Sequence, residues 1–305
     1  ASVPAANQKD HSTRWWIEGK GGRVGSDVRM EVRSPRAISA LLSAPGQLGV
    51  ARAYINGDLE VSGDLYTAFD RLANAAVRDV PLHEKATLAR AFAPFLLSRP
   101  APPPEEVHHK GGRHSRRRDA EVISHHYDVS NTFYEWVLGP TMAYTCAVFP
   151  TSDATLEQAQ EEKFDLVCRK LGLQPEMRVL DVGCGWGGFA MHAARHYGVD
   201  VIAVTLSEQQ AAWGQRAVEA AGLGDQIDIR FSDYRAVPEG GFDRIASIGL
   251  TEHIGKRNYA SYFGFLRSRL VDGGRLLNHC ITRTDPTQRT YTRNGFINRY
   301  IFPDG

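Results

Sequence analysis

The chain has 305 residues, of which 42% are hydrophobic and 23% charged, with a formal net charge of +1. These globular proportions exclude a wholly disordered or fibrous protein, and the length suggests about two domains. No uncharged apolar run is long enough for a transmembrane helix, and residues 1–8 lack the apolar core of a signal peptide. Four cysteines are too few for a disulfide scaffold, so we expect a cytoplasmic protein in a reducing compartment.

The small net charge conceals an asymmetry along the chain. Residues 1–120 hold 18 basic and 13 acidic residues, whereas residues 121–305 hold 18 and 22. Much of the basic excess lies in residues 108–118, together with three histidines. Such a run attracts the phosphates of nucleic acid or of anionic lipid, and it is also typical of a solvated linker.

The N-terminal residues predict a small α/β domain. Two short strands are expected at Trp15–Ile17 and Val28–Val32, and helical segments at Arg36–Leu42, Gly49–Tyr54 and Asp64–Ala76. Four prolines between Pro100 and Pro104 exclude a helix or a central strand there. We therefore divide the chain into an N-terminal domain of residues 1–98, a proline-rich and basic linker of residues 99–120, and a larger domain of residues 121–305.

The larger domain begins with a long predicted helix and then alternates strands and helices. The first helix is expected over Leu156–Leu171. Apolar strands follow at Val179–Val182, Val201–Thr205, Ile227–Phe231, Phe242–Ile248 and Gly274–Cys280. Helices separate them at Gly187–His196, Ser207–Ala221 and Tyr259–Leu270. This alternation predicts an α/β fold with a parallel sheet that helices cover on both faces.

A glycine-rich segment, Gly183-Cys184-Gly185-Trp186-Gly187-Gly188, follows the first of these strands and opens a helix. Glycines let the backbone turn tightly and approach a ligand, and the start of the helix adds a positive dipole end. The pattern G-x-G-x-x-G is shared by proteins that bind NAD and proteins that bind S-adenosylmethionine (SAM).

Two details favour SAM over NAD. Asp181 stands at the end of the strand ahead of the glycines, where a carboxylate can pair with the ammonium group that SAM has and NAD lacks. The NAD pattern expects an acidic residue after the second strand, whereas this strand ends in Thr205-Leu206-Ser207. We therefore expect a Rossmann-like domain that binds SAM, with dinucleotide binding as the alternative.

Several longer motifs in this domain point to one family. They run over about residues 120–305 and are His126–Asn131, Tyr144–Ala147, Val179–Gly188, Val204–Ser207, Glu252–Gly255 and Phe296–Pro303. On these motifs the chain resembles the cyclopropane-fatty-acyl-phospholipid synthases, which include mycolic acid cyclopropane synthases and actinobacterial enzymes that make methylene and 10-methyl fatty acids. The resemblance implies a Rossmann-like class I SAM-dependent methyltransferase fold for the larger domain. The N-terminal domain resembles the extra domain of the phospholipid-acting members.

The resemblance implies transfer of the SAM methyl group to a cis double bond in an acyl chain, followed by loss of a proton from the carbocation to a bicarbonate ion. It also implies that Glu252, His279 and the backbone of Cys146 and Ile281 hold this ion. The residues support part of this, because Glu252 follows a predicted strand and His279 lies near the end of another, where ligands bind in open α/β sheets. A solvated acid at a helix start and a buried core histidine remain the alternatives.

For the cofactor, the resemblance implies contacts from Tyr144, Thr145, Gly183, Thr205, Leu206, Gln210, Tyr234 and Ile248. Asp233 and Tyr234 follow the third strand, where an adenine would sit, and the glycine loop contributes Gly185. A tyrosine ring can stack on the base or on the sulfonium cation.

The cysteines are interpreted mainly as packing residues. Cys146 invites a nucleophilic role, but methyl transfer from SAM needs no covalent enzyme intermediate. Cys168, Cys184 and Cys280 stand in apolar patterns. No pair of cysteines has zinc spacing, so we expect no metal.

Two features depart from the family pattern. Thr251 stands where members commonly have an aromatic residue before the Glu-His pair, and a lost ring removes cation–π stabilisation of a carbocation. A methylene or methyl branch is therefore an alternative product to a ring. Family members also continue beyond Gly305, with a tyrosine that helps to hold the bicarbonate and with much of the acyl tunnel, so we expect the C-terminal part of this domain to be missing.

We predict a SAM-dependent methyltransferase that acts on unsaturated acyl chains of phospholipids. We expect it to associate peripherally with the inner face of the membrane through the basic linker and to bind no nucleic acid; a homodimer is left open. One alternative is an NAD-dependent oxidoreductase, which the missing acidic residue disfavours. The other is a nucleic-acid-binding protein that uses the basic run, which the lack of a recognition helix or stacking motif disfavours.

Overall fold

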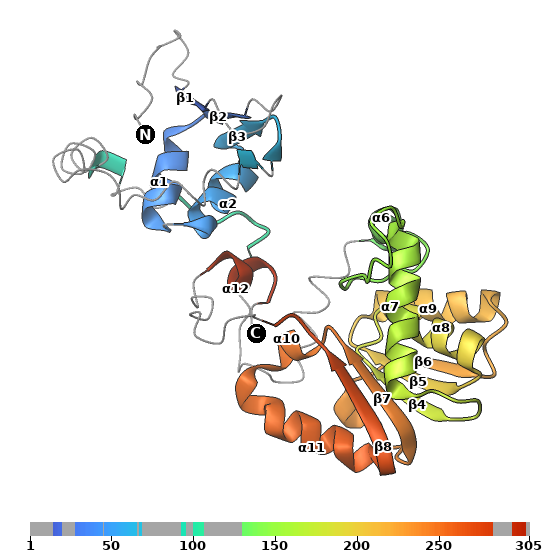
Figure 1. Ribbon diagram of the computed structural model, residues 1–305. Coiled ribbons are helices and arrows are strands. Elements are labelled where there is room, and N and C mark those ends of the chain that lie inside the picture. The colour runs from blue at the N-terminus through green and yellow to red at the C-terminus, as the bar shows by residue number, and fades with distance from the viewer. Residues whose placement is uncertain are drawn as a thin grey trace. The chain divides into compact units, whose positions relative to one another are not determined.

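We describe the fold from a computed structural model, which places residues 15–19, 28–44, 46–65, 67–68, 93–95, 100–106, 130–282 and 295–302. Two compact units make up the chain (Figure 1). Unit 1 comprises residues 1–107 and 291–300, and unit 2 comprises residues 108–290 and 301–305. The domain boundaries expected after residues 98 and 120 lie outside the described residues and stay predictions.

Unit 1 contains a small antiparallel sheet with two helices packed on it. In sheet order its strands are β1 (Trp15–Gly19), β2 (Val28–Val32) and β3 (Leu59–Ser62), and the helices are α1 (Pro35–Ser43) and α2 (Gln47–Ile55). The Ser34 side chain caps α1 by accepting from the Arg36 N–H. Ala37, Ala40, Ala53 and Leu59 form the core. The sequence predicted each of these elements except β3, which has only four residues.

The segment of residues 100–106 forms neither helix nor strand, as its prolines predict. It ends at Glu106, whose buried carboxylate accepts two hydrogen bonds from Arg52, both at 2.7 Å. Tyr300, the last residue of α12 (Phe296–Tyr300), donates to the same carboxylate at 3.2 Å. Burial opposes ionisation of Glu106, but these partners outweigh it and hold the pKa below its ordinary value. Most of the helix expected over Asp64–Ala76 and the basic run of residues 108–118 lie outside the described residues.

Unit 2 is built on a parallel sheet of five strands in the order β6-β5-β4-β7-β8. The strands are β4 (Arg178–Val182), β5 (Asp200–Thr205), β6 (Ile227–Phe231), β7 (Phe242–Ile248) and β8 (Leu270–His279). All five were predicted, although β8 begins before the expected Gly274. The chain runs outward from β4 to β6 and then returns to β7 on the other side of β4. The strand order therefore reverses at β4, which is where ligands bind in sheets of this kind.

Helices cover both faces of this sheet (Figure 1). One face carries α7 (Leu156–Leu171), α8 (Gly188–Tyr197) and α9 (Glu208–Ala220), and the other carries α11 (Tyr259–Arg269). Alternate residues of β4 serve the two cores, because Val179 packs with the first group and Leu180 with the second. Four short elements were not predicted: α6 (Asn131–Leu138), η2 (Tyr234–Ala236), α10 (Thr251–Ile254) and η3 (Lys256–Asn258). Across the described residues, no helix combines the length and apolar content that crossing a bilayer requires.

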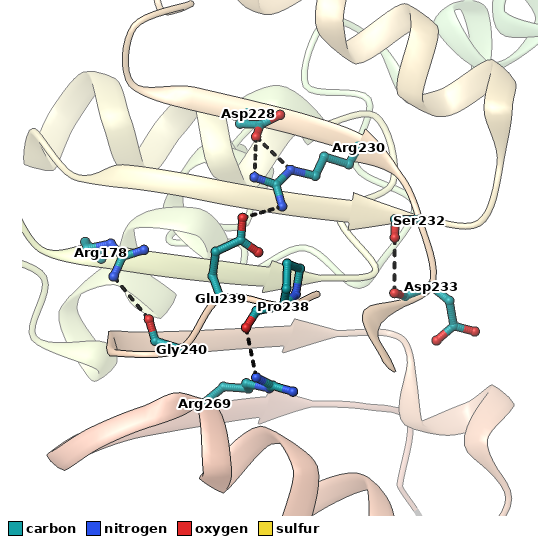
Figure 2. A network of polar contacts seen from close by, with 9 residues as sticks. All are labelled: Arg178, Asp228, Arg230, Ser232, Asp233, Pro238, Glu239, Gly240 and Arg269. Carbon is teal, nitrogen blue, oxygen red and sulfur yellow. Dashed lines mark hydrogen bonds and ion pairs between the residues drawn. The ribbon is translucent and has the colours of Figure 1, made fainter. Parts of the chain in front are cut away.

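A polar network fixes the segment that connects β6 to β7 (Figure 2). Its contacts join Arg230 to Asp228 and Glu239, Arg178 to the carbonyl of Gly240, and Arg269 to the carbonyl of Pro238. Tyr234 and Arg235 belong to the same segment, just after the carboxyl end of β6. The network therefore holds these two residues at the edge of the sheet where a ligand would bind.

Candidate functional site

The glycine loop turns the chain between β4 and α8 at the carboxyl edge of the sheet. The N–H groups of Gly183 and Cys184 both donate to the carbonyl of Val204 in β5, at 2.9 and 3.0 Å. Gly183 and Gly185 have φ angles of 79° and 56°, in the left-handed region that favours glycine. A Cβ atom at Gly185 would meet no atom within 4 Å. The loop therefore leaves open space directly beside its backbone.

A cavity of about 270 Å³ lies beside this loop, at the carboxyl ends of β4, β5, β6 and β7. Ten of the eleven residues expected to bind the cofactor line it: Tyr144, Thr145, Asp181, Gly183, Gly185, Thr205, Leu206, Gln210, Tyr234 and Ile248. The eleventh, Asp233, is absent from the lining. Its carboxylate instead binds the guanidinium group of Arg235 at 2.5 Å, and Arg235 does line the cavity.

Asp181 in β4 puts a carboxylate into the wall of this cavity. The residue is 1% exposed, and its Oδ2 atom has no hydrogen-bond partner among the described residues. Burial raises the pKa of Asp181 to about 7, and the ammonium group of Lys163 acts in the opposite direction. A buried carboxylate oxygen without a donor suits a ligand that brings a positively charged donor, such as an ammonium group.

Two buried polar residues of α7 that the sequence analysis did not single out support the wall: Lys163 lines the cavity, and Gln160 bonds to the backbone of lining residues behind it. Gln160 and Lys163 are each 3% exposed. The Gln160 amide donates to the carbonyls of Ala143 and Thr145 at 3.3 and 2.8 Å, and Lys163 Nζ donates to Thr145 Oγ1 at 2.9 Å. Burial lowers the pKa of Lys163 to about 8. The signal in the sequence was a polar pair next to Phe164, on the apolar stripe of a predicted helix.

Aromatic rings support the two tyrosines that the resemblance assigns to the cofactor. Tyr144 lies 5.7 Å from the Tyr134 ring, centroid to centroid, and Tyr134 lies 4.7 Å from Trp186. Trp186 is buried and donates its indole N–H to Asn131 at 2.9 Å. Tyr234 packs edge-on against Tyr262 at 5.1 Å. These contacts restrict where each tyrosine ring can lie in the wall of the cavity.

Glu252, Ile281 and His279 come together next to the cavity. Glu252 lies in α10 and accepts a hydrogen bond from the Ile281 N–H at 2.8 Å. His279 ends β8 and pairs in register with Ile248 of β7. Glu252 Oε2 and His279 Nδ1 both lack a hydrogen-bond partner among the described residues. None of these three lines the cavity, nor does Cys146, which directly follows the lining residue Thr145.

The electrostatics of His279 connect this cluster to the cavity wall. Burial lowers the pKa of His279, the Lys163 ammonium group lowers it further, and the Glu252 carboxylate acts in the opposite direction. His279 is therefore neutral at neutral pH and can exchange a proton with a bound group. Thr251, beside Glu252, is 2% exposed, and its Oγ1 accepts from Asn278 at 3.4 Å.

The cysteines differ in environment. Cys168 and Cys184 lie in or against the core, and burial raises the pKa of Cys168 to about 12 and that of Cys184 well above its ordinary value. These two fit the packing role expected of them. Cys146 is exposed, and Cys280 is half-buried. Over the described ranges, no three His, Cys, Asp or Glu side chains gather as a metal site would require, and the histidine pairs at residues 108–109 and 125–126 lie outside those ranges.

Comparison with known proteins places the chain in a family. The model of the family described as mycolic acid cyclopropane synthetase matches residues 114–305. The chain belongs to this family. A probable fatty acid methyltransferase of Mycobacterium tuberculosis is 51% identical over 299 residues, which cover 93% of this chain and 70% of the relative. The cyclopropane-fatty-acyl-phospholipid synthase of Escherichia coli K12 is 35% identical over 288 residues, covering 93% and 67%.

A solved structure agrees with this membership of the cyclopropane synthetase family. A cyclopropane synthase of Mycobacterium tuberculosis superposes with a TM-score of 0.57 and 38% identity, covering 61% of this chain and 68% of that one. The family resemblance and the class I methyltransferase fold are thus confirmed. The chain is a SAM-dependent methyltransferase of the type that acts on lipid chains, and neither the oxidoreductase nor the nucleic-acid alternative is supported. It spans about two thirds of the length of these relatives.

Proposed function

We propose that this chain transfers the methyl group of SAM to the cis double bond of an unsaturated acyl chain in a phospholipid, giving a cyclopropane ring or a methylene or methyl branch. The observation that carries the proposal is the buried Asp181 carboxylate beside the glycine loop, with an oxygen that has no donor in the described part of the chain. SAM brings the ammonium group that this oxygen suits and, on its sulfonium, a methyl group that an alkene can attack.

The residues of the cavity would bind and orient the two reactants. Thr205 and Gln210 fix one another through a hydrogen bond of 2.7 Å between Oγ1 and Oε1, which sets the wall at the end of β5. Tyr144 and Tyr234 add two aromatic residues to the cavity wall. Aromatic and apolar walls exclude water that would trap a carbocation, and the faces of aromatic rings favour positive charge.

Glu252 and His279 are our candidates for holding the base that accepts the proton lost by the carbocation. Their unpartnered atoms, Oε2 and Nδ1, fit a small group that both donates and accepts hydrogen bonds. A bicarbonate ion bound between them would supply the base. The Ile281 N–H, which the resemblance assigns to that ion, donates to Glu252 in this structure, so it would orient the carboxylate. The backbone of Cys146 remains a predicted contact.

The test compares Glu252→Gln with Glu208→Gln, a control that also removes a first-turn carboxylate but an exposed one. Glu252→Gln should retain SAM affinity and lose roughly 10²-fold or more in turnover, the scale of a positioned acid–base group. Depleting bicarbonate should slow the parent, and the Glu252 substitution should then matter far less, because the two act as one unit. Full activity of Glu252→Gln in every condition would remove Glu252 from the mechanism.

The same assay reads out the product, since mass spectrometry of the lipids distinguishes a ring from a methylene or methyl branch. Thr251 bears on that outcome. It stands next to Glu252, where an aromatic ring would stabilise the cation, and it offers a methyl group and a hydroxyl instead. We therefore propose that a branch competes with ring closure in this protein.

We further propose that the chain docks on the inner face of the membrane through its basic residues between Lys110 and Arg118. Each basic residue near an anionic surface contributes roughly 1 kcal/mol. Changing Arg116, Arg117 and Arg118 together to serine should weaken binding to anionic vesicles by orders of magnitude and leave SAM affinity unchanged. Equal vesicle binding by variant and parent, or tighter binding of the parent to duplex DNA than to vesicles, would contradict this proposal.

A further inference from the structure

Two buried groups of opposite charge share the wall of the cavity. Lys163 comes from α7 and is 3% exposed, and Asp181 comes from β4 and is 1% exposed. Both line the cavity, and each lowers the cost of burying the other's charge. They nevertheless form no direct ion pair, because no nitrogen–oxygen distance between them is 4.0 Å or less.

Neither group has its hydrogen bonds filled. An ammonium group has three N–H donors, and Lys163 uses one, to Thr145 Oγ1 at 2.9 Å, while the face of Phe164 lies 4.0 Å away. Asp181 Oδ2 has no donor among the described residues. Buried charges without full hydrogen bonding are costly, so the wall keeps a cation with unused N–H donors and an anion with an unpartnered oxygen.

The charge pattern matches a ligand that carries an ammonium group and a carboxylate on the same carbon atom. We propose that Lys163 binds the carboxylate at the amino-acid end of SAM while Asp181 binds the ammonium group, so that the two residues together recognise the zwitterion. This inference rests on the proposed binding of SAM in this cavity. It gives Lys163 a contact with the cofactor that no motif in the sequence assigned to it.

Four titratable groups around the pair have pKa values shifted toward their neutral forms. His192 of α8 and His279 of β8 face Lys163, and their pKa values are lowered by burial, that of His192 to about 4. Cys184 of the glycine loop and Tyr262 of α11 interact with Asp181, and burial raises the pKa of both. Cys146 completes the surroundings of Lys163. Lys163 and Asp181 therefore dominate the field at this end of the cavity.

The experiment measures the affinities of three probes by calorimetry: SAM, decarboxylated SAM and methylthioadenosine. The first carries the carboxylate and the ammonium group, the second only the ammonium group, and the third neither. The variants are Lys163→Met and Asp181→Asn, with Lys170→Met as a control that removes an exposed lysine of the same helix.

Lys163→Met should weaken SAM binding roughly 10- to 100-fold, the scale of a lost charged hydrogen bond, and leave methylthioadenosine unchanged. Because the charge of Lys163 also favours ionisation of Asp181, decarboxylated SAM should bind more weakly too, but by a smaller factor than SAM. Asp181→Asn should weaken SAM and decarboxylated SAM but spare methylthioadenosine, and Lys170→Met should change none. Equal loss for SAM and decarboxylated SAM in Lys163→Met, or no loss for SAM, would overturn the proposal. If Lys163→Met does not fold, the parent still decides, because equal affinity for SAM and decarboxylated SAM refutes a carboxylate contact. Failure of the parent to bind any probe would instead refute the proposed function.

Discussion

Replacing Gly185 by alanine should weaken SAM binding without disrupting the fold. Gly222, in the turn between α9 and β6, provides a matched control. The two glycines have φ angles of 56° and 68°, and a Cβ atom at either position would meet no atom within 4 Å. They differ in place, because Gly185 lines the cavity and Gly222 does not.

The expected magnitudes follow from this geometry. Each substitution puts a Cβ atom into the left-handed region, at a cost of about 1–2 kcal/mol in the free energy of unfolding. For a chain of 305 residues that corresponds to a fall in Tm of roughly 2–3 °C. Only at Gly185 does the new methyl group also enter the space that a ligand would occupy. Overpacking of this kind costs about 1–3 kcal/mol, or roughly 5- to 150-fold in Kd.

The assay is calorimetric titration with SAM, together with thermal unfolding of parent and variants. The two variants should lose similar thermal stability, and only Gly185→Ala should lose affinity. Gly183→Val is a less specific perturbation, because a Cβ atom at Gly183 would lie 3.3 Å from Leu250 and would disturb packing as well. Equal SAM affinity in Gly185→Ala and Gly222→Ala would show that the open side of the loop is not ligand space, and the assignment of the cavity would fail.

Three further predictions concern charge and packing. Glu106→Gln should lower the free energy of unfolding by roughly 1–3 kcal/mol at neutral pH. Because the pKa of Glu106 is lowered in the folded state, the parent should lose this advantage as the pH falls through the carboxyl range. Denaturant titrations of parent and variant at two pH values can check this. SAM affinity should be greatest between about pH 7 and pH 8, because Asp181 must be ionised and Lys163 must be protonated. The pKa of Asp181 is about 7 and that of Lys163 is about 8. An affinity that stays constant from pH 6 to pH 9 in calorimetry would contradict this. Trp186→Ala should lower the free energy of unfolding by about 3–5 kcal/mol because the ring is buried. Trp136→Ala should lower it by less than about 0.5 kcal/mol because that residue is 82% exposed. Denaturant unfolding curves of the two variants and the parent compare these effects.

The fold of unit 2 was predictable because its signals are local. Apolar strands such as Ile227–Phe231 and Phe242–Ile248 have the predicted bounds, and α7 has a capping box at Thr155 and a left-handed glycine at its end. The missed elements are short. β3 has four residues and α10 has four, too few for a period to be visible, so tertiary contacts rather than pattern determine them.

The candidate site was predictable where it follows strand ends and unpredictable where a helix contributes to it. Gly183 directly follows one predicted strand, and Thr205 is the last residue of another. The topology of a parallel sheet brings such residues together at one edge. Lys163 lies on a helix whose buried face looks apolar overall, so its position in the cavity wall depends on how α7 packs on the sheet. Asp233 stays a predicted cofactor contact, and the sequence does not reveal that Arg235 binds its carboxylate.

Gln160, which lies behind the wall, provides a test that separates the effect of the cavity's shape on SAM affinity from the effect of its charge. Its amide donates to the carbonyls of Ala143 and Thr145, so it fixes the backbone of the segment that also presents Tyr144. Gln160→Leu would leave two carbonyls without this donor, at roughly 1–3 kcal/mol, and would let the segment shift. Because the change alters the shape of the wall and no charge, SAM, decarboxylated SAM and methylthioadenosine should all bind more weakly by similar factors, unlike in Lys163→Met. Gln158→Leu, on the exposed side of the same helix, should leave all three affinities unchanged. A loss confined to SAM in Gln160→Leu would mean that the amide contacts the amino-acid end of the ligand directly, and the positioning role argued for Gln160 would be wrong.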